Sequence, residues 1–243
     1  MTDTDQRLAS NSQETSKLRI TLANLKGGVG RSTSSVYLAL TLARLRPTER
    51  VLLVDADASN PTSWDWSEDA AEDWPAQIVV NRWPSVHLAK RIKEVSGDYD
   101  HVIVDTGPHD AGIVRAALQV TDHLLLPLAP SMSEVKRVTP TLDVAAEVAV
   151  LRPIQLSLLF NRVVPNTRSR IEAREALEGM GLHVLAAEVG RREAYSGAHG
   201  SVPTDLGTYP DVLEELLRRP PADADDDTAD STGIDDTATE GER

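Results

Sequence analysis

At residues 26–33 the chain reads Lys26-Gly27-Gly28-Val29-Gly30-Arg31-Ser32-Thr33, a glycine-rich stretch that decides its fold. The apolar run 18–25 before it predicts a strand, and the amphipathic run 34–45 after it predicts a helix that Pro47 ends. We expect this helix to turn the following apolar side chains toward a sheet: Val36, Leu38, Leu40, Leu42 and Leu45. In such a strand–turn–helix unit, successive backbone N–H groups point into one concavity, where the helix N-terminus adds partial positive charge. The stretch therefore predicts a phosphate-binding loop, and a chance glycine turn is the alternative.

The loop departs from the common phosphate-binding pattern G-x-x-x-x-G-K-[ST] at two positions, because Leu25 stands at its first glycine and Arg31 at its lysine. It closely resembles the loop K-G-G-V-G-K-[ST]-[ST] of the ParA/MinD family of partitioning and positioning ATPases, which form the deviant Walker A class of P-loop NTPases. Within this resemblance only the second lysine is changed, to Arg31. Arginine keeps the positive charge, but its guanidinium is larger and planar, so the geometry at the phosphates changes.

The resemblance implies a nucleotide site made of Lys26 and residues 27–33, with ATP and Mg²⁺ as cofactors. Lys26 matches the family's signature lysine, which reaches the phosphates held by the other subunit and so implies a homodimer in the ATP state. The backbone of residues 28–32 would hold the β-phosphate, and Arg31 would reach toward the β/γ oxygens. The Ser32 hydroxyl would ligate Mg²⁺, and Thr33 would touch the α-phosphate.

Composition limits the classes of protein that the chain can belong to. With 243 residues and 40% hydrophobic content it is long enough for one sizeable α/β domain. The absence of cysteine excludes disulfides and Cys-ligated zinc, and the six histidines show no ligand spacing. The apolar runs are shorter than the roughly 20 residues of a membrane span, and the N-terminus lacks an apolar signal core. We therefore expect a cytoplasmic protein without a membrane partner.

The charge is unevenly distributed along the chain. Residues 1–17 have no hydrophobic period and predict a disordered polar arm, too short for a helix-turn-helix domain. Residues 220–243 predict an acidic disordered tail that begins at a proline doublet. Of the net charge of −13, the tail carries −8 and the arm −1, which leaves −4 for the predicted ATPase domain, 18–219. This mildly acidic domain leaves room for a local basic patch.

Two carboxylates follow the apolar run 51–54, in the order Asp55-Ala56-Asp57. The run suits a parallel strand buried on both faces, and its end lies at the ligand side of an open α/β sheet. The segment resembles the family's D-x-D-P-Q switch, with Asp55 and Asp57 matched. The resemblance implies that Asp57 orients or activates the attacking water and that Asp55 belongs to the metal site. A cap or loop-ordering role for the pair is the alternative.

A third carboxylate, Asp105, ends the strand predicted at 99–105, in which residues 102–104 are apolar. An aspartate at this place beside a phosphate loop usually holds Mg²⁺. The segment resembles the family's Walker B and second switch, hhhhD-x-x-P, with Asp105 and Pro108 matched and Gly107 where a second proline is common. The alternative is that Asp105 caps a helix beginning at Ala111.

The rest of the chain continues to alternate strands and helices, with a strand at 123–128, a helix at about 131–150, a strand at 154–160 and a last helix at 209–219. This order predicts an α/β fold with a doubly wound, mostly parallel sheet and helices on both faces. Asn161 follows the strand 154–160. In small ParA proteins an asparagine at this strand end contacts adenine, which makes Asn161 a candidate for base recognition, although it also suits a turn.

Three further patterns involve tryptophans and arginines. The cluster Trp64, Trp66, Trp74 and Trp83 predicts a small satellite core or a dimer contact rather than nucleic-acid stacking, because its charged neighbours are acidic. Arginines at 168, 170 and 174 alternate with glutamates, which is typical of an ion-paired helix face. Arg191 and Arg192 resemble the family's segment where an exposed arginine supports sequence-independent DNA binding; the start of a surface helix is the alternative.

The resemblance covers about residues 18–215 and fits best the short, ParF-like partition proteins. It implies a dimer that ATP closes, that binds DNA nonspecifically and is then nucleoid-associated, and that hydrolyses ATP slowly with a ParB-like centromere-binding partner. Two alternatives remain. The first is a related positioning ATPase whose cargo is a protein. The second is an ATP-binding regulator that does not hydrolyse ATP, because Arg31 replaces the loop lysine.

Overall fold

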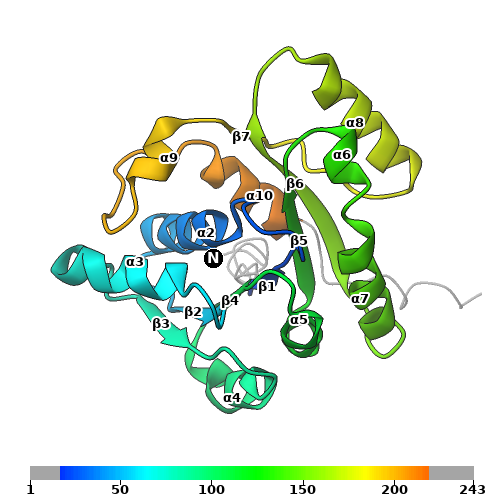
Figure 1. Cartoon of the computed structure of the whole chain (residues 1–243). Helices are drawn as coiled ribbons and strands as arrows, with labels where there is room; N and C mark the ends of the chain where they lie inside the picture. Colours follow the sequence, from blue (N-terminus) through cyan, green and yellow to red (C-terminus); the bar gives the residue numbers. More distant parts are fainter. Residues whose placement is uncertain (1–16, 219–243) are drawn as a thin grey trace, which may run out of the picture.

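A computed structural model describes residues 17–218, apart from the side chain of Ser196, and places a parallel sheet between two layers of helices (Figure 1). The strands are β1 (Arg19–Leu22), β2 (Val51–Ala56), β3 (Ile78–Arg82), β4 (His101–Thr106), β5 (His123–Leu128), β6 (Gln155–Val163) and β7 (Val189–Gly190). They form one seven-stranded sheet in the order β3-β2-β4-β1-β5-β6-β7, and all neighbours are parallel. The predicted doubly wound α/β fold is confirmed.

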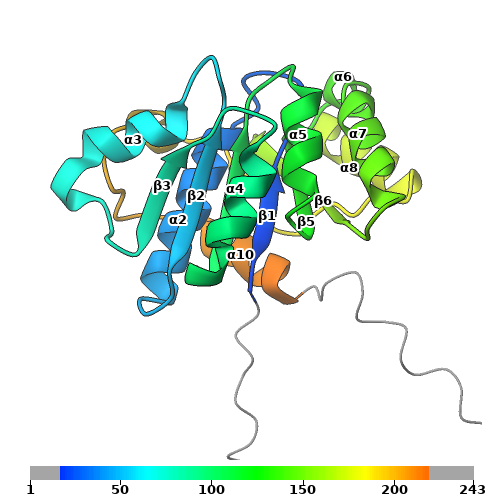
Figure 2. The ribbon, with the colours of Figure 1, turned by 90° about the horizontal axis from the view of Figure 1, so that it is seen from below.

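The direction of each strand connection decides which face its helix covers, since crossovers between parallel strands are right-handed. Connections that step toward β3 carry α2 (Arg31–Leu45) and α3 (Thr62–Ala70). Connections that step toward β7 carry α4 (Leu88–Val95), α5 (Ala111–Leu118), α6 (Met132–Val135), α7 (Thr139–Ala149) and α8 (Arg168–Gly179). In Figure 2, α4 and α5 lie in front of the strands, and α2 and α10 (Tyr209–Arg218) lie behind them. Helix α2, which follows β1, covers one face, whereas α5 and α7, which follow the neighbouring strands β4 and β5, cover the other. The loop after β1 therefore lies at a switch point where open sheets bind ligands.

Helix α2 is buried almost all round, which corrects the expected amphipathic pattern. Its residues 34–43 are all buried. One side packs on the sheet, and α10 covers the other side through Tyr209, Val212, Leu213 and Leu216. Leu45, which was expected to face the sheet, is 57% exposed because it lies at the helix end beyond this cover.

Other boundaries also differ from the sequence prediction. The helix expected at 131–150 is broken into α6 and α7, and Pro140 sits in the first turn of α7, where a missing N–H is tolerated. Strand β3 was not predicted; it is a short edge strand whose residues are mostly half-buried. Strand β6 continues past Asn161 to Val163, while the short α9 (Glu193–Gly197) follows β7. Two 3-10 turns occupy Ala71–Asp73 and Ser96–Asp98.

The packing interpretation of the tryptophan cluster is confirmed for Trp66, which is 2% exposed and donates from Nε1 to the Ser201 carbonyl at 2.7 Å. The ion-paired face is confirmed on α8, where Arg168 Nε lies 2.6 Å from Glu172 Oε1. The predicted arm and acidic tail lie outside the described residues, except for Lys17. Within residues 17–218, the structure contains no helix with the length and apolar character of a membrane span.

Candidate functional site

The glycine-rich loop between β1 and α2 has two left-handed residues, Gly28 with φ 73° and Gly30 with φ 90°. Only glycine adopts this conformation without steric cost, so these positions fix the shape of the turn. Helix α2 begins immediately after it, and Ser34 N–H donates to the Gly30 carbonyl at 2.9 Å. The N–H groups before Ser34 therefore have no helical partner and are available to an anion.

Asn161 clamps this loop from strand β6. Its Nδ2 donates to the Val29 carbonyl at 3.2 Å, and its Oδ1 accepts from the Arg162 N–H at 2.8 Å. A Cβ at Gly30 would overlap the Asn161 amide, so Asn161 can approach the loop this closely only because residue 30 is a glycine. Base recognition by Asn161 remains a prediction, and the structure gives this side chain a loop-holding role that sequence reasoning missed.

Arg31 lies under the loop and is only 7% exposed. Its Nη1 donates to the Lys26 carbonyl at 2.7 Å and also to the Asn24 carbonyl. Burial lowers the pKa of the Arg31 guanidinium, while the nearby charges of Asp105 and Asp57 oppose that shift. Arg31 thus braces the loop backbone with its positive charge, and its reach toward the β/γ oxygens remains a prediction.

Lys26 is held within its own subunit, because its Nζ forms an ion pair with Glu134 on α6. Glu134 is 8% exposed, and Arg137 Nη1 lies 3.9 Å from the same Glu134 oxygen. Sequence reasoning missed Glu134, since the residue lies far from the loop along the chain and no motif marks it. The signature lysine would have to leave this carboxylate to reach a second subunit.

Asp55 and Asp105 are cross-strand neighbours on β2 and β4. Asp105 Oδ2 accepts from Ser63 Oγ at 2.7 Å, and Ser32 also hydrogen-bonds to this carboxylate. Burial raises the pKa of Asp105, and the bonds from Ser63 and Ser32 and the charge of Arg31 oppose the shift. The cap alternative for Asp105 is wrong, because Asp110 caps α5 by accepting from the Ile113 N–H.

Asp105 and Ser32 fit a magnesium ion. Asp105 Oδ1 is buried and has no hydrogen-bond partner among residues 17–218, and oxygen ligands of this kind suit Mg²⁺. The same residues contain no group of three or more His, Cys, Asp or Glu side chains that could hold a metal alone. Water and phosphate oxygens would therefore complete the coordination, as is usual for Mg²⁺.

Asp55 orders the loop that carries Asp57. Its Oδ1 and Oδ2 accept from the N–H groups of Asp57 and Trp64, both at 3.0 Å. Burial, followed by the charge of Asp105, raises the pKa of Asp55 to about 7, against these hydrogen bonds. The predicted place of Asp55 in the metal site remains a prediction, and the structure shows the loop-ordering role that was its alternative.

Asp57 faces the glycine-rich loop. Its Oδ1 accepts from the N–H groups of Ser59 at 2.8 Å and Asn60 at 3.0 Å. It lines a cavity of about 280 Å³, here called the cradle cavity, together with the loop, the segments after β2 and β4, and one residue of β6: Gly27–Thr33, Ser59, Asn60, Thr62, Pro108 and Arg162. The structure thus brings the predicted loop and the predicted water-orienting residue together.

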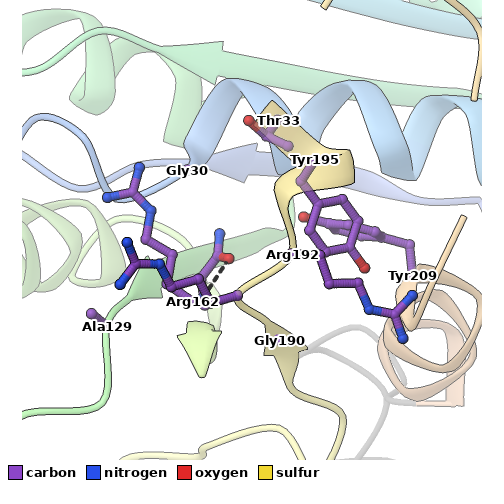
Figure 3. A pocket seen from close by; sticks show the side chains of 10 residues that line it. Gly30, Thr33, Ala129, Arg162, Gly190, Arg192, Tyr195 and Tyr209 are labelled. Atoms are coloured by element: carbon purple, nitrogen blue, oxygen red, sulfur yellow. Dashed lines mark hydrogen bonds between the residues drawn. The ribbon is translucent and has the colours of Figure 1, made fainter. Parts of the chain in front are cut away.

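A larger cavity of about 570 Å³, here called the side cavity, lies beside the cradle cavity (Figure 3). It is lined by residues of the loop and the start of α2, of the β5, β6 and β7 ends, and of α9 and α10: Gly30, Thr33, Ala129, Asn161, Arg162, Gly190, Arg191, Arg192, Tyr195 and Tyr209. The two cavities share Gly30, Thr33 and Arg162. A ligand with a phosphate end and a bulkier end could therefore occupy both.

Arg191 and Arg192 border the side cavity. Arg192 Nη1 lies 3.2 Å from Asp205 Oδ2, and both side chains are exposed. Their DNA-binding role remains a prediction. Arg162, Tyr195 and Tyr209 also line this cavity, and sequence reasoning missed all three; the position of Arg162 directly after Asn161 was the available signal.

Residues 20–201 match the family described as the CobQ/CobB/MinD/ParA nucleotide binding domain. The Maintenance of carboxysome distribution protein A of Gloeobacter kilaueensis is 32% identical over 183 residues, which cover 74% of this chain and 79% of that protein. Protein ParA of Rhizobium radiobacter is 28% identical over 182 residues, which cover 73% of this chain and 80% of that protein.

Two solved structures have the same fold. The apo McdA structure from Cyanothece matches with a TM-score of 0.63 and 21% identity, over 82% of this chain and 98% of that chain. A plasmid partition protein from Borrelia burgdorferi B31, bound to AMPPNP, matches with a TM-score of 0.59 and 20% identity, over 82% of this chain and 96% of that chain. At this level of sequence identity, the structural similarity shows that the chain has the same fold as these two proteins.

Proposed function

Because the chain belongs to the CobQ/CobB/MinD/ParA family of nucleotide-binding domains, we propose that it is an ATPase that binds ATP with Mg²⁺ and works as a nucleotide-switched homodimer. One observation carries the proposal. The glycine-rich loop, Asp57 and the cavity that they line lie beside Asp105, whose Oδ1 is buried without a partner among the described residues. This arrangement supplies N–H donors for phosphate oxygens, a metal ligand and a group that can orient water.

In this proposal each part of the site has its own task. The loop N–H groups bind the β-phosphate, and Arg31 below them adds positive charge. Ser32 and Asp105 hold Mg²⁺, which neutralises charge on the phosphate oxygens when bound. Asp57 accepts a hydrogen bond from the attacking water and orients it toward the γ-phosphate. Lys26 leaves its ion pair with Glu134 and binds the phosphates of the nucleotide held by the second subunit.

We propose that the dimer positions a cargo while bound nonspecifically to DNA, and that the cargo is a protein assembly. The 32% identical relative is named for carboxysome distribution, which supports a protein cargo. The partner would then be an adaptor on that cargo. DNA partition with a ParB-like partner is the second candidate, supported by the relative named ParA.

DNA binding is proposed for Arg191 and Arg192, which lie next to the side cavity. Their placement supports a link between nucleotide and DNA, because a ligand in the side cavity would touch the segment that carries both arginines. Binding to nonspecific DNA in ATP and in ADP tests this link. Equal affinity in the two nucleotides would contradict a switch.

Steady-state ATP turnover by the wild type and by Asp57→Ala, with Mg²⁺ and nonspecific DNA, tests the proposed ATPase. We expect slow turnover in the wild type and none in the variant, with ADP affinity retained. If ATP binds but neither protein turns it over, even with the cargo partner added, the chain is a non-hydrolysing regulator. The changed geometry of Arg31 at the phosphates would account for the absence of ATP turnover in that case.

A further inference from the structure

Arg162 has an unusual backbone for a strand residue. Its φ is 58° within β6, a left-handed value that is uncommon for residues other than glycine. Asn161 pairs with Val189 and Val163 pairs with Gly190, so Arg162 is the extra residue of a bulge. Bulges re-aim side chains beside functional sites, and strained backbone also concentrates there. The bulge is stabilised by the bond from the Arg162 N–H to Asn161 Oδ1 at 2.8 Å.

The bulge aims the Arg162 side chain at the place where the two cavities meet. Arg162 lines both the cradle cavity and the side cavity, as do Gly30 and Thr33. Figure 3 shows Arg162 on one side of the side cavity and Tyr195 and Tyr209 on the other. Of the three residues shared by the cavities, Arg162 is the one with a charged side chain.

The Arg162 guanidinium is also unengaged. Within residues 17–218 it has no ion pair or side-chain hydrogen bond, and Arg162 is exposed, so a ligand can reach its side chain. Arg31, in contrast, donates to carbonyls of the loop, and Arg192 is paired with Asp205. A free guanidinium at the edge of a phosphate site is a strong donor to phosphate oxygens.

We propose that Arg162 binds the nucleotide at the junction of its ribose and its phosphates, by donating to an α-phosphate oxygen. The inference rests on the proposed nucleotide function. A nucleotide that places its phosphates in the cradle cavity and its base in the side cavity must pass the shared residues. The group that lies at that junction is the α-phosphate with the attached ribose.

The test measures the affinity of the full chain for ADP and for inorganic phosphate by calorimetry, in the wild type and in Arg162→Ala. We expect ADP affinity to fall about tenfold or more, as for the loss of a charge-assisted hydrogen bond, and the affinity for inorganic phosphate, which occupies only the position held by the loop, to stay unchanged. Arg162→Gly should lose ADP affinity equally while relieving the strained backbone, which separates the charge from the fold. Arg168→Ala is the matched control, because this exposed α8 arginine pairs with Glu172 and lines neither cavity.

Each other outcome overturns the inference in a distinguishable way. Unchanged ADP affinity in Arg162→Ala, with the wild type binding normally, removes the contact but leaves the proposed function standing. An equal loss for ADP and inorganic phosphate places Arg162 on the phosphate held by the loop and contradicts the junction. A wild type that binds neither ligand overturns this inference together with the proposed function.

Discussion

The position of the Asp57 carboxylate depends on a missing methyl group at Gly107. A Cβ on Gly107 would lie 2.9 Å from Asp57 Cγ, closer than real Cβ contacts come. We predict that Gly107→Ala displaces Asp57 and lowers the rate of ATP hydrolysis by about a hundredfold, with little change in ADP affinity, because misplacement by about 1 Å has that effect. Steady-state turnover and ADP titration measure the two quantities.

Gly97→Ala is the control for this prediction. No heavy atom lies within 4 Å of the position that a Cβ would take there, and Gly97 is far along the chain from the loop. It should hydrolyse ATP at the wild-type rate. A Gly107→Ala variant with unchanged turnover would show that the exact place of Asp57 is unimportant to the reaction.

His101 gives the protein a predicted dependence of stability on pH. Its Nδ1 accepts from the Leu18 N–H at 3.0 Å, its Nε2 contacts Glu49, and burial lowers its pKa despite that carboxylate. The unfolded chain therefore binds the proton first, with a pKa of about 6.5. The stabilising contribution is complete above that value and is lost as the pH falls through the lower folded pKa.

Urea unfolding of the wild type and of His101→Asn, between about pH 7.5 and about pH 5, measures this contribution. The free energy of unfolding should fall more steeply with decreasing pH in the wild type than in the variant. Equal slopes in the two proteins would contradict the assignment to His101.

Among the elements, α2 is joined to α10 by a stacked pair of aromatic rings and to α9 by an edge-to-face pair. The centroids of Tyr37 and Tyr209 lie 4.9 Å apart, and those of Tyr37 and Tyr195 lie 5.0 Å apart. Tyr209 Oη also lies 3.0 Å from Ser34 Oγ, in the first turn of the helix that follows the loop. Helix α10 thus holds the base of the phosphate loop in place.

A double-mutant cycle of Ser34→Ala and Tyr209→Phe tests this contact. Ser34→Ala leaves the buried Tyr209 hydroxyl without this partner, and Tyr209→Phe leaves the Ser34 hydroxyl with only the 3.5 Å contact from Asn161 Nδ2, so each change should cost about 1 to 3 kcal/mol of unfolding free energy. The double variant should be destabilised by less than the sum, because both hydroxyls are then removed. Denaturant unfolding measures the four proteins, and strictly additive costs would contradict a direct bond.

The elements also show what the sequence could and could not predict about the fold. Strands β1, β2, β4 and β5 were predicted because a parallel strand buried on both faces reads as a continuous apolar run. The all-round burial of α2 was not predictable, because it depends on α10, which lies far away in sequence. Edge strand β3 gave a weak signal, since its residues are mostly only half-buried.

The candidate site shows the same division. The loop and the three carboxylates lie in local motifs, so they could be placed from the sequence alone. Their partners could not: Glu134 meets Lys26 across 108 positions, and Asn161 meets Val29 across 132. Such contacts follow from strand order, which local patterns do not encode.

At the scale of the whole molecule, one topological feature gathers the site. All strands are parallel, so the loops after β1, β2 and β4 open on the same edge of the sheet, and the helices after β1 and after β4 lie on opposite faces. The same edge carries Lys26, whose proposed target is the nucleotide of another subunit. The central claim is therefore that the nucleotide decides whether two chains associate.

The most direct test of this claim is the molar mass of the full chain in Mg²⁺-ATP and in Mg²⁺-ADP, measured by light scattering after size-exclusion chromatography. We expect twice the mass of one chain in ATP and a single chain in ADP. Lys26→Ala should stay monomeric in both nucleotides, whereas Glu134→Gln, which releases Lys26 from its ion pair, should still dimerise in ATP. The same mass in ATP and in ADP for the wild type would contradict a nucleotide-switched dimer.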